Sequence, residues 1–128
     1  MKLISFIHQG QATYGAVIGQ DQVVHLGAHL GAQAPDLQSL LAQDMLAQAQ
    51  ALSASEAPTL TLAELELLPV IPNPGKIICV GLNYHDHVRE TGRELTESPA
   101  LFLRVANSQV AHGQALSLIH ISEPTRPY

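Results

Sequence analysis

A proline-rich stretch in the middle of the chain constrains its fold most strongly. Pro69 is followed after two residues by Pro72-Asn73-Pro74-Gly75. Because proline lacks a backbone N–H and has a fixed φ, neither a helix nor an internal strand continues through such a stretch. We therefore predict a linker between a small domain over residues 1–70 and the start of a second domain over residues 71–115.

The first domain combines short β-type runs with one helical pattern. Residues 2–7, 13–18 and 22–26 are rich in Val, Ile, Tyr and Phe and are separated by glycine-containing turns, which predicts an antiparallel meander. Apolar residues recur at helical spacing over 36–52, and Asp36 is a suitable N-cap. We expect one amphipathic helix to cover the meander. Residues 60–68 form a further apolar segment.

The second domain begins with residues 76–80, a nearly continuous apolar run that Gly81 ends. Such a run is typical of a strand buried on both faces. Cys79 lies within it and is interpreted as a small core hydrophobe, because no activating neighbour is visible. The predicted fold class is α+β, mainly β.

The composition excludes several classes of partner. Six basic and eleven acidic side chains give a net charge of -5 without a Lys/Arg cluster, so nucleic acid is an unsuitable partner. The N-terminus lacks the features of a signal peptide, and no apolar run is long enough to span a bilayer. The single cysteine excludes an internal disulfide. We expect a cytoplasmic protein with no membrane partner.

Titratable and hydrogen-bonding side chains are concentrated in residues 81–92, directly after the predicted buried strand. If Asp86 caps a short helix, His87 and Glu90 lie on one face, where the carboxylate could fix the tautomer of a general base. The same spacing is common in surface helices and decides nothing alone. His85 and His87 could also bind a transition metal, but two ligands without a third make a weak site.

The wider segment resembles the opening of the catalytic domain of the fumarylacetoacetate hydrolase family. Residues 72–84 read PNPGKIICVGLNY, His87 and Glu90 complete the motif Asn-Tyr-x-x-His-x-x-Glu, and residues 98–104 read SPALFLR. The resemblance covers about residues 76–114, and the small domain is similar, less specifically, to the N-terminal domain of bacterial members. It implies that residues 71–115 are the first strands of a truncated mixed β-sandwich or β-roll catalytic domain.

The family's chemistry implies a role for each matching residue. His87 and Glu90 would be the catalytic, water-activating pair, while Asn83, Tyr84 and Arg104 would contact the substrate. Members hold a divalent cation, Mg²⁺ or Mn²⁺, on three carboxylates and act on 2-keto acids. Hydrolysis of the carbon–carbon bond of an acylpyruvate, as in aromatic catabolism, is the expected reaction; hydration, isomerisation and decarboxylation remain alternatives. The whole enzyme would be a homodimer.

Two departures from the family pattern matter. Relatives usually carry Phe-x-Lys-Pro where this chain has Phe102-Leu103-Arg104-Val105, so a planar guanidinium replaces an ammonium, and a solvated Arg104 is an equal alternative. The metal-binding carboxylates, a Glu-x-Glu pair and a later Asp, would follow further along, yet only Glu123 occurs beyond Gln114. We expect this chain to lack the metal ligands and to be inactive.

The last thirteen residues, 116–128, do not continue the resemblance. Residues 116–126 read LSLIHISEPTR, the translation of an end sequence and adapter used in transposase-based DNA library preparation. We expect this tail to be non-native, and a natural terminus is the alternative. A different class of function also stays open: residues 2–52 could form a non-catalytic domain that binds a partner or supports an oligomer.

Overall fold

The computed structural model describes residues 1–81, 92 and 100–115, and the chain divides into two compact units. One unit holds Met1–Pro72 together with residues 110–115, and the other holds the described residues of Asn73–Gln109. The division falls within the proline-rich stretch, between Pro72 and Asn73. The predicted tail at 116–128 lies outside the described residues.

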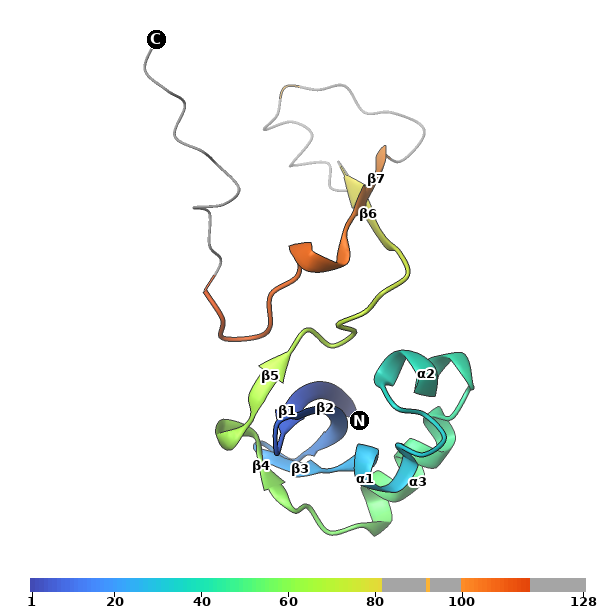
Figure 1. The fold of residues 1–128 in the computed structure, drawn as a ribbon, viewed down its shortest axis with the longest axis vertical. Coiled ribbons are helices and arrows are strands. Elements are labelled where there is room, and N and C mark those ends of the chain that lie inside the picture. Colours follow the sequence, from blue (N-terminus) through green and yellow to red (C-terminus); the bar gives the residue numbers. More distant parts are fainter. Residues whose placement is uncertain (82–91, 93–99, 116–128) are drawn as a thin grey trace. The chain divides into compact units, whose positions relative to one another are not determined.

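The first unit is built on an antiparallel meander of β1 (Lys2–His8), β2 (Gln11–Ile18) and β3 (Gln22–Val24) (Figure 1). Gln9 and Gly10 join β1 to β2 with φ angles of 51° and 78°. Two successive left-handed residues match the two-residue turns whose twist suits a β-hairpin, and Gly10 adopts its φ without strain. The turn therefore sets the β1–β2 register, with His8 opposite Gln11.

The sheet contains two further strands that the sequence did not indicate. β4 (Leu60–Thr61) pairs with β3, and β5 (Glu66–Leu68) pairs with β1, so the strand order is β4-β3-β2-β1-β5. The two edge strands are joined only through the 3₁₀ turn η1 (Leu62–Glu64). A flat sheet would separate its edges by about 19 Å, which so short a connection hardly spans. The sheet is accordingly curled, as Figure 1 shows.

Three helices accompany this sheet: α1 (Leu26–Leu30), α2 (Leu37–Ala42) and α3 (Leu46–Ser55). The predicted N-cap is confirmed, since the Ser39 backbone N–H donates to Asp36 Oδ1 at 2.7 Å. The prediction of one helix over 36–52 is wrong. Asp44 has a φ of 55°, a left-handed conformation that aspartate tolerates better than most residues, and it breaks the pattern into two helices.

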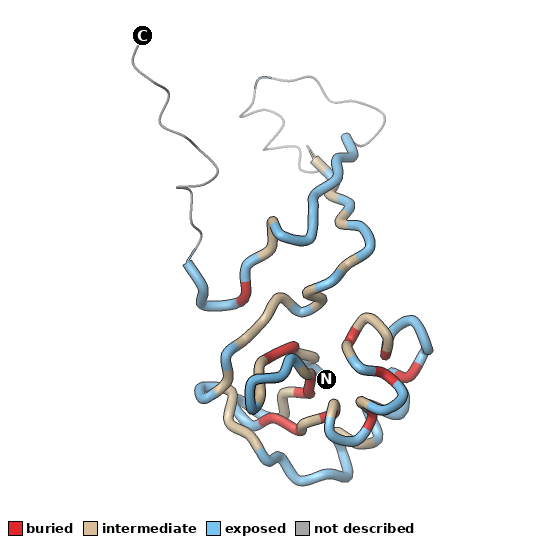
Figure 2. Tube along the Cα trace, in the orientation of Figure 1, coloured by how far each residue is buried: buried red, intermediate tan, exposed pale blue. Residues whose placement is uncertain are grey.

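A single apolar cluster joins the helices to one face of the sheet. The break at Asp44 lets Met45 turn inward, where it is only 6% exposed. Figure 2 shows the buried positions gathered in this first unit. The cluster comprises Tyr14, Ala16, Val24, Leu26, Leu30, Ala34, Leu37, Leu40, Met45 and Ala49. The expected mixture of helix and strand is confirmed.

The second unit contains an antiparallel pair, β6 (Ile77–Gly81) and β7 (Ala100–Arg104), followed by the 3₁₀ turn η2 (Ala106–Ser108). The expectation that residues 76–80 are buried on both faces is wrong for this chain, since Ile78 is 61% and Val80 50% exposed. Among the described residues β6 has one partner strand and no second layer over it. The sandwich or roll implied by the resemblance stays a prediction.

None of the helices in the described ranges is both long and apolar enough to cross a membrane.

Candidate functional site

The predicted catalytic segment lies between the two strands of the second unit. Asn83, Tyr84, His87 and Glu90 fall outside the described residues. Gly81 and Ala100, the residues that flank the segment, pair directly with each other at one end of the β6–β7 hairpin. The segment therefore leaves and re-enters the sheet at the same place, and the roles assigned to its side chains stay predictions.

Arg104, the remaining predicted substrate contact, lies at the other end of this hairpin. It pairs with Ile77, four residues along β7 from Ala100, which corresponds to about 13 Å of extended strand. Its side chain is exposed, and Nη2 donates to the Ser108 carbonyl at 3.2 Å. That bond turns the guanidinium toward η2, and a role with substrate remains a prediction.

The cation expected from the family needs oxygen ligands, chiefly carboxylates, gathered at one point. Within residues 1–81, 92 and 100–115 no group of three or more His, Cys, Asp or Glu side chains could hold a metal ion. The described residues do not fit a resident cation.

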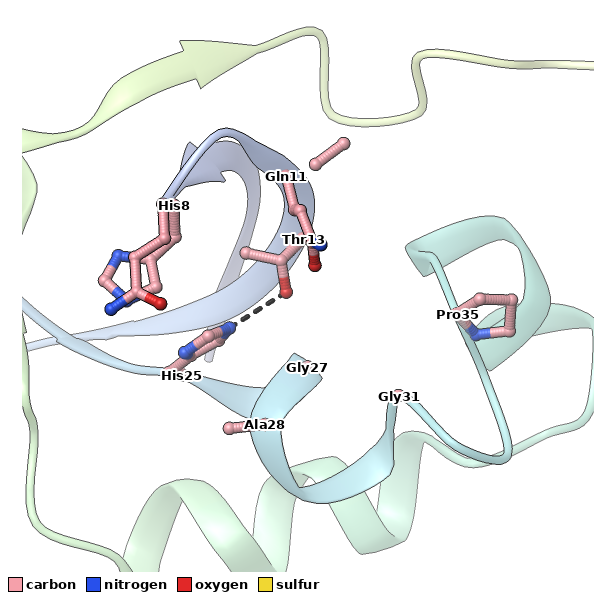
Figure 3. Close-up of a pocket in the computed structure, with 10 residues that line it drawn as sticks. His8, Gln11, Thr13, His25, Gly27, Ala28, Gly31 and Pro35 are labelled. Carbon is pink, nitrogen blue, oxygen red and sulfur yellow. Dashed lines mark hydrogen bonds between the residues drawn. The ribbon is translucent and has the colours of Figure 1, made fainter.

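A cavity in the first unit brings together polar side chains that the sequence analysis did not single out. Its volume is about 420 Å³, and it lies beside the β1–β2 turn, facing α1 (Figure 3). Phe6 pairs with Thr13 and His8 pairs with Gln11, so all four side chains share one face of the sheet. His8, Gln11 and Thr13 line the cavity.

His25 packs against this face from the end of β3. Its ring lies 5.1 Å from the ring of His8, edge to face, and 5.6 Å from that of Phe6. His25 Nε2 and Thr13 Oγ1 share a hydrogen bond of 2.9 Å, drawn as the dashed line in Figure 3. Burial, and then the nearby His8 and His29, lower the pKa of His25 below its ordinary 6.5. The ring is consequently neutral near pH 7.

Gly27 permits the close approach of α1 to this hydrogen bond. A Cβ at Gly27 would overlap Thr13 Oγ1 and would lie 3.4 Å from His25 Nε2. Any larger side chain at this position would have to displace the hydroxyl or the helix. The glycine thus fixes one wall of the cavity beside its most polar pair.

Only part of the lining of this cavity could be predicted from the sequence. The Gln9-Gly10 turn predicts the hairpin register that sets His8 opposite Gln11. This cross-strand pair could therefore have been predicted from the sequence. The return of His25 onto the same face depends on the curl of the sheet and on α1, which was not predicted. The polar side chains of this cavity can donate and accept hydrogen bonds.

Comparison with known proteins gives partial matches, several of them to proteins named as oxaloacetate tautomerases. No family model matches the chain. It is 35% identical over 57 residues to the mitochondrial oxaloacetate tautomerase FAHD2A of Bos taurus, a stretch covering 44% of this chain and 18% of that protein. It is 40% identical over 57 residues to an uncharacterized protein of Archaeoglobus fulgidus, covering 44% of this chain and 22% of that protein.

A third relative is the mitochondrial oxaloacetate tautomerase fahd-1 of Caenorhabditis elegans, 42% identical over 41 residues, or 32% of this chain and 19% of that protein. The chain spans about a fifth of the length of the curated relatives it matches. The expected resemblance to the fumarylacetoacetate hydrolase family is confirmed over this stretch, at modest identity and over part of the chain.

Proposed function

We propose that the whole protein is an enzyme that interconverts the keto and enol forms of a 2-keto acid such as oxaloacetate. The observation that carries this proposal is the match to proteins named as oxaloacetate tautomerases, in cow and in nematode. This changes the order of the reactions expected from the sequence: tautomerisation, one of the isomerisations, comes before carbon–carbon bond hydrolysis.

Tautomerisation moves one proton from the carbon next to the keto group to the keto oxygen. In the proposed site His87 accepts the carbon-bound proton, and the imidazolium so formed gives a proton to the keto oxygen. Glu90, three residues away, holds the imidazole in the required tautomer. Asn83, Tyr84 and Arg104 contact the carboxylates and the keto oxygen of the substrate. A divalent cation, Mg²⁺ or Mn²⁺, belongs to this proposal on the family resemblance alone, and no step here depends on it.

Carbon–carbon bond hydrolysis of an acylpyruvate is the second candidate, favoured by the pairing of His87 with Glu90. The same imidazole would then take a proton from water, and the resulting hydroxide would attack the acyl carbonyl. The carbon–carbon bond to the pyruvate portion would break, and the departing pyruvate enolate would take the proton back from the imidazolium. The two reactions differ in one requirement. Only hydrolysis consumes water and yields two products, so product analysis separates them.

The experiment begins with the source gene, sequenced across the codons for Ala115 and Leu116. The longest natural reading frame is then expressed and assayed for loss of the enol absorbance of oxaloacetate and, separately, for cleavage of an acylpyruvate. We expect faster tautomerisation with Mg²⁺, and a loss of at least about a hundredfold in His87→Gln, the usual scale for a general base. Cleavage without tautomerisation would favour the second candidate. The absence of both activities would leave hydration, decarboxylation and the non-catalytic binding domain as the remaining alternatives.

The proposal for the whole protein also includes its cellular compartment and its oligomeric state. We propose a cytoplasmic homodimer, although the cow and nematode relatives are named as mitochondrial. Cell fractionation of the tagged natural product and its sedimentation coefficient test these two points directly.

A further inference from the structure

The cavity beside the β1–β2 turn has the lining of a ligand site. We propose that it binds a small organic acid, with one carboxylate held by His8, Thr13 and His25 and a short apolar body against α1. The inference is independent of the proposed enzymatic function, because every residue that carries it belongs to the first unit.

The charge of the residues that line the cavity favours a ligand with a single negative charge that accepts hydrogen bonds. Within the part of the chain that the structure describes, ten residues line the cavity and none of them is Asp, Glu, Lys or Arg: His8, Gln9, Gln11, Ala12, Thr13, His25, Gly27, Ala28, Gly31 and Pro35. Without an acidic side chain, nothing in the lining repels a carboxylate. Without a guanidinium or ammonium, the more highly charged phosphate lacks the partners that usually hold it.

The Thr13–His25 pair keeps a donor available whichever way its hydrogen bond runs. If Nε2–H donates to Oγ1, the threonine hydroxyl hydrogen remains to be offered. If the hydroxyl donates to Nε2, the proton of the neutral ring is on Nδ1, which can donate instead. Two glutamine carboxamides add further N–H groups along the rim, from Gln9 and Gln11. A carboxylate, which accepts several hydrogen bonds at once, matches this surplus of donors.

The opposite side of the cavity suits a short apolar body. Ala28 and Pro35 contribute carbon surface, and Gly27 keeps that wall close to the polar pair (Figure 3). The volume of about 420 Å³ lies at the smaller end of the range of roughly 300–1,000 Å³ found for small-molecule sites. An aromatic or short branched acid fits these limits better than a nucleotide.

Sodium benzoate is a suitable probe for the 128-residue chain, followed by NMR of the histidine ring protons at constant ionic strength. We expect saturable shifts of the His8 and His25 resonances, while His112, which is outside the lining, serves as the internal reference. Benzamide has the same body without the charge and should bind about tenfold more weakly, since hydrogen bonds to charged groups are the stronger ones. Sodium chloride should produce no saturable shift.

Three substitutions test whether benzoate binds in this cavity. Thr13→Val keeps the shape of the side chain, removes its hydroxyl and should weaken benzoate binding about fivefold, the value of one hydrogen bond. Thr61→Val makes the same chemical change in β4, outside the lining, and should leave the affinity unchanged. Gln11→Ala changes an exposed residue at the start of β2, so it keeps the test valid if Thr13→Val fails to fold.

Three results would overturn the inference. Benzamide could bind as tightly as benzoate, which would remove the carboxylate from the recognition. Zn²⁺ could shift the two histidines saturably where benzoate does not, which would make the cavity a two-imidazole metal site. If Thr13→Val and Thr61→Val weakened benzoate binding equally, benzoate would not bind in the cavity.

Discussion

The Tyr14 hydroxyl donates a hydrogen bond of 2.8 Å to the backbone carbonyl of Ala34. Tyr14 lies in the middle of β2, and Ala34 lies in the segment between α1 and α2; both are fully buried. The bond ties the sheet to the chain that leads into the second helix. Burial, and then the charge of Asp36, raise the pKa of Tyr14, so its hydroxyl remains a donor at neutral pH.

Removing this hydroxyl should destabilise the first unit measurably. Tyr14→Phe keeps the ring in the core but leaves the Ala34 carbonyl without this donor, which costs about 1–3 kcal/mol for a buried acceptor. Urea unfolding monitored by circular dichroism gives the change in unfolding free energy. Ser53→Ala is the control, because the Ser53 hydroxyl donates to a carbonyl of its own helix at 2.7 Å. Similar losses in the two variants would show that Tyr14 has no special role.

The N-cap of α2 provides a second, smaller prediction. Asp36 Oδ1 accepts the Ser39 backbone N–H, and replacing a cap of this kind by alanine costs about 1 kcal/mol. Asp36→Ala should lower the unfolding free energy by that amount, whereas Asp36→Ser, which can still accept the bond, should recover most of it. If Asp36→Ser does not recover the lost unfolding free energy, the effect of Asp36 comes from its charge and not from the cap.

The local features of the first unit were accessible from the sequence. The β1–β2–β3 meander follows from its glycine turns, and the start of α2 follows from Asp36 after Pro35. Both depend on residues close together in the chain. The break at Asp44 was missed because the apolar spacing continues through it. Three residues separate α2 from α3, and of these Asp44 has the left-handed conformation.

The strands β4 and β5 could not be predicted in the same way. Each is only two or three residues long, and each pairs with a strand more than thirty-five residues away in the sequence. Their pairing depends on the curl of the sheet, which no local pattern encodes. The same applies to the cavity, since His25 reaches Thr13 and His8 only when β3 and α1 are in place. The roles of His87 and Glu90 came from a motif and stay predictions.

Acidification should weaken the first unit through His25. Its folded-state pKa is below the ordinary 6.5, so at pH values between the two the unfolded chain binds the proton more readily than the folded one. The contribution of His25 to the unfolding free energy is therefore fully present above pH 6.5. It decreases as the pH falls toward the lowered pKa of His25 in the folded state. Burial is the main cause of the lowered pKa of His25, and the nearby His8 and His29 add to the effect.

Melting temperatures measured between pH 7.5 and 5 test this linkage. His25→Gln should flatten the pH dependence, and His112→Gln should leave it unchanged. If the unchanged chain and the two variants showed the same pH dependence of the melting temperature, other titratable groups would be its cause.

The exposed face of the β6–β7 hairpin should make the chain self-associate. Ile78 and Val80 pair with Leu103 and Leu101, so all four side chains lie on one face, and they are between 50% and 72% exposed. A contiguous apolar face on strands with open edges is a site of association between chains. Leu103→Thr retains good strand propensity while removing apolar surface from the most exposed of the four.

Sedimentation velocity over a concentration series should show less association for Leu103→Thr than for the unchanged chain. Val110→Thr is the matched control, since Val110 is also exposed, at 44%, but lies outside the hairpin. If both variants reduce association equally, general hydrophobicity drives it. If neither does, this face does not mediate it. A selective effect of Leu103→Thr would identify the hairpin as the surface that, in a longer protein, needs another layer of structure to cover it.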